Sequence, residues 1–175
     1  VHMCTVLLPE EHLALETKLG SSTREAIGCL TTMVVLGPLL TDQRILNLCD
    51  NSGAECILGR SRAAGSITLS NIAVVFHAVA EALGCEPWLT YCPGAFMIAD
   101  PCSRPVRGCK WWSEIFESLG FGFVTTSVEA FRGVLGDLLR HKELLGHDSG
   151  IVARISKLAV FGCLDTATAT RWANG

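Results

Sequence analysis

The chain lacks the features that would place it in a membrane or on a secretory route. Its longest apolar run, residues 27–40, includes Gly37 and Pro38 and is shorter than the ~20 residues that a membrane-spanning helix needs. Its first residues show no basic segment followed by an apolar stretch and a small-residue cleavage site. We therefore expect no membrane span and no secretory signal.

Charge is scarce, and its balance is wrong for a free-standing nucleic-acid binder. Only 18% of the 175 residues are charged, and 14 basic against 17 acidic side chains give a net charge of −3. Proteins that neutralise several phosphates usually carry a basic excess. Any surface that binds nucleic acid must therefore be local. The apolar composition, 49% of residues, argues against disorder and predicts that other protein chains cover part of the surface.

The nine cysteines show no short repeated spacing of the kind that marks a zinc site or a disulfide framework. Several fall in expected strands or helices, where they replace small apolar residues. We predict free thiols in an intracellular, reducing compartment, and a packing role for Cys49. A metal site formed by Cys85, Cys92, Cys102 and Cys109 is the less favoured interpretation because the gaps are wide and irregular.

The hydrophobic pattern alternates between helical and strand periods. Helices are expected at residues 23–36, 52–58, from 66 or 68 to 84, 110–119, 128–145 and 151–161, and strands at residues 44–49 and 86–91. Residues 2–8 and 120–126 are weaker strand candidates, and residues 99–101 begin a helix or turn. This order favours an α/β fold in which helices connect parallel strands.

Three carboxylates stand where such a fold could bring them together. Glu25 lies in the first turn of an expected helix, Asp50 ends an expected strand, and Asp100 begins a helix or turn. Carboxylates at these positions could hold two magnesium ions for phosphodiester cleavage. Each also has a local explanation: a capping box with Ser22 for Glu25, turn chemistry for Asp50, and a helix cap before Pro101 for Asp100. The residues alone leave both explanations open.

Short motifs accompany these carboxylates in a fixed order. They are Ser21-Ser22-Thr23-Arg24-Glu25, Asp50-Asn51, Tyr91-Cys92-Pro93-Gly94, Ala99-Asp100 followed by Ser103-Arg104, and the tryptophans and VEAF segment up to residue 131. Their order and spacing resemble the ribonuclease H region of retroelement reverse-transcriptase polyproteins of the tyrosine-recombinase type and its relatives. The resemblance implies a ribonuclease H-like mixed sheet flanked by helices in residues 1–131, and leaves residues 132–175 as a helical extension.

The resemblance also implies an activity. In that family the matching residues bind Mg²⁺ and cleave the RNA strand of RNA:DNA hybrids, so Glu25, Asp50 and Asp100 are implied as catalytic and metal-binding residues. A basic loop is implied to hold the phosphate backbone, through Arg60, Ser61, Arg62 and Ser66. Exposed loop arginines are common, so a solvated loop is the alternative for this segment.

One departure from the family concerns its first strand, which supplies a further aspartate. Before Ser21 the acidic residues are Glu10, Glu11 and Glu16, and none matches. Losing one metal-binding carboxylate lowers activity by several orders of magnitude on the usual scale. Two hypotheses therefore stay open. The chain belongs to a ribonuclease H whose missing aspartate lies upstream or on another chain, or it is a domesticated, non-catalytic subunit of a larger assembly, such as an organellar ribonucleoprotein or a membrane complex.

Overall fold

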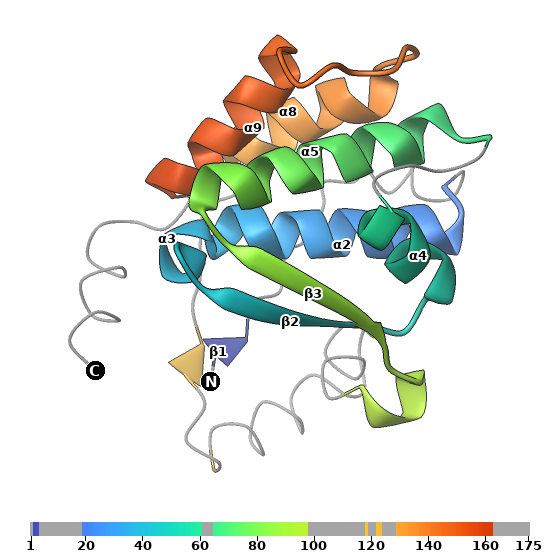
Figure 1. The fold of residues 1–175 in the computed structure, drawn as a ribbon, viewed down its shortest axis with the longest axis vertical. Helices are drawn as coiled ribbons and strands as arrows, with labels where there is room; N and C mark the ends of the chain where they lie inside the picture. The colour runs from blue at the N-terminus through green and yellow to red at the C-terminus, as the bar shows by residue number, and fades with distance from the viewer. Residues whose placement is uncertain are drawn as a thin grey trace.

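A computed structural model describes residues 2–3, 19–60, 65–97, 118, 122–123 and 129–162. These residues form a mixed α/β structure that is mostly helical (Figure 1). The expected helix or turn at residues 99–101, with Asp100, lies outside the described residues, as does the helix at residues 110–119 apart from Ser118.

The main sheet consists of two parallel strands, β2 (Arg44–Cys49) and β3 (Glu86–Tyr91). Arg44 pairs with Glu86 at one end and Cys49 with Tyr91 at the other. A second parallel pair joins β1 (His2–Met3) to β4 (Gly122–Phe123). The α/β class, the bounds of both main strands and their parallel pairing are therefore confirmed.

The described helices lie in the segments where the hydrophobic pattern has a helical period. They are α2 (Ser21–Val35), α3 (Gly37–Leu40), α4 (Ser52–Arg60), α5 (Ile67–Leu83), the 3-10 turn η1 (Gly94–Phe96), α8 (Glu129–Arg140) and α9 (Gly150–Phe161). Helix α5 has well-formed ends: the Ser66 hydroxyl accepts a hydrogen bond from Leu69 N (3.2 Å), and Gly84 closes the helix in the left-handed conformation (φ +61°), which glycine adopts without a steric penalty.

All the large helices lie on one side of the β2–β3 sheet (Figure 1). Helix α2 lies next to the sheet, α5 packs on α2, and α8 and α9 pack on α5. One cluster of buried side chains runs through these layers, and it includes the predicted stripe of α5: Ile72, Val75, Phe76, Val79 and Leu83. The expected domain boundary between residues 131 and 132 stays a prediction. In the structure both residues lie within α8.

Two local expectations were wrong. The capping box with Ser22 as the cap does not form, because α2 begins at Ser21 after Gly20. The helix expected to run to residue 145 ends at Arg140. Asn71 of α5 fixes the loop that follows, because its side chain bonds Glu143 O (2.8 Å) and Leu145 N (2.9 Å).

The face of the sheet that points away from the helices carries large apolar side chains. Leu46 and Trp88 are paired across the two strands and are 65% and 62% exposed, and Leu48 is 49% exposed. An ion pair between Arg44 and Glu86 (3.2 Å) lies at the start of both strands. Since parallel strands are usually buried on both faces, this outer face is unusual for a parallel sheet.

Helix α9 is seated closely on the turn between α2 and α3. A side chain at Gly37 would collide with the backbone of Ala159, including its carbonyl oxygen. Glycine is therefore required at this position for the two backbones to approach. Among the described residues, no helix is both long enough and apolar enough to cross a membrane.

Candidate functional site

The end of β2 is tied to the first turn of α2 through the side chain of Asn51. Ser22 Oγ donates to Asn51 Oδ1 (2.9 Å), and Asn51 Nδ2 donates to Ser21 Oγ (3.2 Å). The same Asn51 oxygen accepts from Ala54 N (3.0 Å) and so caps α4. A Cβ at Gly53 would stand 2.6 Å from Ser22 Oγ. Glycine at that position lets the two elements approach, and one amide thus fixes three elements at a common corner.

Asp50 lies at the same corner. It follows the last residue of β2 and is half-buried, and its side chain makes no hydrogen bond or ion pair with the described residues. The end of β3 lies beside it, because Cys92 N donates to Cys49 O (2.8 Å) and a Cβ at Gly94 would lie 3.4 Å from Asp50 Oδ2. The capping chemistry of this segment belongs to Asn51.

Glu25 reaches the same region from α2. Its carboxylate acts electrostatically on the thiols of Cys29 and Cys49, and Asp50 acts on Cys49 as well. Glu25 and Cys29 are four residues apart, which places them on one side of the helix. Cys49 is buried at the end of β2. Two of the three predicted carboxylates therefore lie near enough to Cys49 to act on its charge, while Asp100 lies outside the described residues.

Cys29 and Cys49 interact with each other in this corner, and each shifts the pKa of the other. The hydrogen bond from Cys29 lowers the pKa of Cys49 to about 7, although burial and the Glu25 and Asp50 carboxylates raise it. The same contact, together with burial, raises the pKa of Cys29. The Cys49 Sγ atom also donates to Asn51 O (3.4 Å). Cys49 belongs to the buried core, as the packing interpretation of this residue predicts.

The described residues do not by themselves complete a magnesium site. Among them, no group of three or more histidine, cysteine, aspartate or glutamate side chains gathers closely enough to hold a metal ion. Glu25 and Asp50 offer the oxygen ligands that Mg²⁺ prefers, but a two-metal centre needs more carboxylates than these two. The ligand set that the sequence predicts therefore depends on Asp100 and on a residue that the resemblance does not locate.

The predicted nucleic-acid loop is described only at its two ends. Arg60 is exposed at the last turn of α4, roughly 12 Å along the helix from Ser52. Ser66 uses its hydroxyl to cap α5. Ser61 and Arg62 lie outside the described residues. Binding of a phosphate backbone by this loop stays a prediction.

The geometry weakens one alternative metal site. Cys85 and Cys92 flank the six-residue strand β3, so roughly 20 Å of extended chain separates them and they cannot share one ion. Both thiols are free. His141 falls within the helix expected at residues 128–145, but it lies, like His147, on the loop between α8 and α9.

Sequence reasoning missed the partners that build the corner. Nothing in the spacing indicates that Ser22 bonds Asn51, 29 residues away, or that Cys29 contacts Cys49. The four-residue step from Glu25 to Cys29 was the one available signal, since it places both on one side of a helix. Comparison of the chain with protein-family models, with curated proteins and with solved structures gives no match.

Proposed function

We propose that this chain is a retroelement-derived ribonuclease H-like domain, with a mixed sheet flanked by helices in its complete form. Glu25, Asp50 and Asp100 would be its metal-binding carboxylates and an RNA:DNA hybrid its substrate. Magnesium would supply the activated water and stabilise the leaving oxygen of the cleaved phosphodiester. The proposal assumes an intracellular, reducing compartment, where the free thiols of the described residues stay reduced.

The observation that carries the proposal is the convergence of Glu25 and Asp50 on one corner. They come from a helix and a strand end, they act on the same thiol, and the Asn51 hydrogen bonds hold their elements together. The order helix, strand, helices, strand with parallel pairing supports it further, because parallel strands bring their carboxyl ends to one edge of a sheet. Ligand sites of α/β folds lie at such edges.

Two measurements test the proposal separately. The first is binding of Mn²⁺, a spectroscopic substitute for Mg²⁺, followed by electron paramagnetic resonance on the full chain. The second is Mg²⁺-dependent cleavage of a labelled RNA:DNA hybrid. We expect Asp50→Asn and Glu25→Gln to weaken Mn²⁺ binding at least tenfold, because each removes one charged ligand. Asp148→Asn, which changes an exposed carboxylate on the α8–α9 loop, is the matched control and should bind as the parent does.

The outcomes separate the working enzyme from an inactive relative. Cleavage that Asp50→Asn abolishes and Asp148→Asn preserves would establish the enzyme. Mn²⁺ binding that depends on Glu25 and Asp50, without cleavage, would retain the ligand assignment and place the missing aspartate outside this chain. A folded sample that neither binds Mn²⁺ nor cleaves the hybrid would overturn the proposal.

The second candidate function is a non-catalytic subunit of a larger assembly. The exposed outer face of the β2–β3 sheet favours it, since Leu46, Leu48 and Trp88 present a continuous apolar surface along two paired strands. Apolar surfaces of this kind on folded proteins commonly mark contacts with other chains. This function becomes the assignment if the chain folds but fails both measurements above.

A further inference from the structure

Helices α8 and α9 enclose an open groove with a volume of about 320 Å³. The two helices contact each other and lie side by side on the outer layer of the fold (Figure 1). The residues that line the groove are Ala130, Val134, Arg154, Lys157, Leu158 and Phe161. Its floor is therefore almost entirely apolar, and the two charged residues that border it are both basic.

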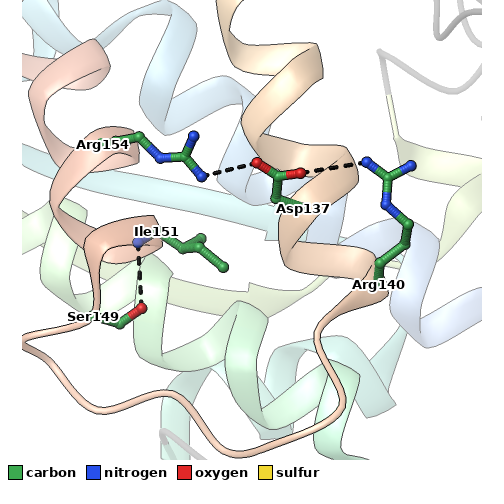
Figure 2. A network of polar contacts seen from close by, with 5 residues as sticks. All are labelled: Asp137, Arg140, Ser149, Ile151 and Arg154. Carbon is green, nitrogen blue, oxygen red and sulfur yellow. Dashed lines mark hydrogen bonds and ion pairs between the residues drawn. The ribbon is translucent and has the colours of Figure 1, made fainter.

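The charges beside the groove leave an excess of positive charge. Asp137 of α8 accepts from Arg154 Nη2 (2.8 Å) and from Arg140 Nη2 (3.3 Å), so one carboxylate lies between two guanidinium groups (Figure 2). Among the described residues, Lys157 makes no ion pair. A ligand that carries carboxylates would complement this border, whereas a basic ligand would be repelled.

Large apolar side chains are exposed at the end of α9. Phe161, which lines the groove, is 76% exposed, and the adjacent Val160 is 40% exposed. Pockets for small molecules usually bury most of their ligand. This groove is open and has exposed apolar neighbours, so it suits a larger partner better. Leu158 and Phe161 are three residues apart on α9, and Lys157 lies one turn before Phe161. Apolar and basic side chains thus run together along one side of the helix.

We propose that the α8–α9 groove binds an amphipathic helix of a partner protein, one whose apolar stripe is flanked by aspartate or glutamate. Such a helix would place leucine-type side chains at positions i, i+3 or i+4 and i+7 in the groove and against Phe161. Its carboxylates would lie beside Lys157 and the Arg154 guanidinium, which line the groove. This surface lies on the C-terminal helices and is independent of the carboxylate corner at Asp50.

The test uses the full chain and two fluorescein-labelled helical peptides. Both carry leucine at i, i+3, i+4 and i+7, one with glutamate and the other with lysine at the flanking positions. Fluorescence anisotropy should show that the acidic peptide binds roughly tenfold more tightly than the basic peptide, with a difference that shrinks as salt rises. Laurate, a fatty acid with an apolar chain and one carboxylate, is the small-molecule competitor.

Two variants assign the binding to the groove. Lys157→Glu should reverse the preference between the peptides, and Phe161→Ala should weaken both by roughly tenfold, because a large apolar contact is lost. Lys142→Glu, which changes the charge of an exposed residue on the α8–α9 loop, is the matched control and should leave binding unchanged. Circular dichroism confirms that each variant is folded.

Three results would overturn the proposal. One is the absence of binding by either peptide to a folded chain. Another is equal binding of both peptides that is insensitive to Lys157→Glu. The third is binding of laurate that depends on Phe161, together with no binding of the acidic peptide. That result would identify the groove as a site for a small amphiphile.

Discussion

Asn71 and Asn47 both place side-chain nitrogens inside the protein, and we expect their replacement by alanine to have very different effects. Asn71 of α5 is fully buried. Its amide donates to Glu143 O and accepts from Leu145 N, which holds the loop after α8 against the core. Asn47 of β2 has a buried Nδ2 atom that has no hydrogen-bond partner among the described residues. The Asn71 amide therefore satisfies two backbone groups, while the Asn47 nitrogen satisfies none in this part of the chain.

The expected loss for Asn71→Ala follows from the two backbone groups it would abandon. Leu145 is buried, so its N–H would lose its partner at a cost of about 1–3 kcal/mol. Glu143 is exposed, so its carbonyl can turn to water and the loss is about 0.5–1 kcal/mol. The free energy of unfolding should therefore fall by about 1.5–4 kcal/mol. For Asn47→Ala, removal of an unsatisfied group offsets the lost packing, and the change should stay within about 1 kcal/mol.

Urea unfolding followed by far-ultraviolet circular dichroism measures both variants, and the free-energy comparison requires similar m values. A loss below about 1 kcal/mol for Asn71→Ala would show that water replaces both hydrogen bonds, which would refute the reasoning. A loss for Asn47→Ala as large as that for Asn71→Ala would show that the Asn47 amide also contributes to stability.

Three further substitutions test glycine positions in α2 and α3 and the ion pairs of α8. Gly37→Ala should lower stability by about 1–3 kcal/mol or more, seen as a fall in Tm, because its Cβ meets the Ala159 backbone. Gly28→Ala, at an exposed site of α2 with no atom near the new Cβ, should instead raise Tm, since alanine favours a helix. Arg154 and Arg140 hold the pKa of Asp137 below its ordinary value of 3.8. Its ion pairs therefore stabilise the fold above that pH and are lost as pH falls through the folded-state pKa. Asp137→Asn should thus be less stable than the parent at pH 7 and equal to it in strong acid, and a difference that persists in acid would contradict this.

The parts of the fold that depend on local periodicity could be predicted from the sequence. The bounds of β2 and β3 agree residue by residue with the expectation, because each is a short run that ends at polar or turn residues. Helix α5 was found because Ser66 and Gly84 supply capping chemistry at both ends. These features need nothing beyond the neighbours of each residue in the chain.

The parts that depend on distant contacts could not be predicted in the same way. The end of α8 at Arg140 follows from Asn71, which captures the next backbone segment from another helix. At the candidate site, the positions of Glu25 and Asp50 were predicted, but the Asn51 and Cys29 contacts that define their corner were not. A polar side chain can hydrogen-bond its own neighbouring backbone or a residue far away in sequence. The local sequence looks the same in both situations, so it does not predict which one occurs.

The close approach of Gly37 and Ala159 has a consequence for how the chain reaches its folded state. These residues lie near opposite ends of the main described region, yet their backbones are in contact. During synthesis, α2 and α5 emerge from the ribosome well before α9, so the seat that α9 fills stays open until α9 itself has been synthesised. Contacts between distant residues slow folding because a long loop must close first. Nascent chains stalled before residue 150 should therefore expose this apolar seat to chaperones.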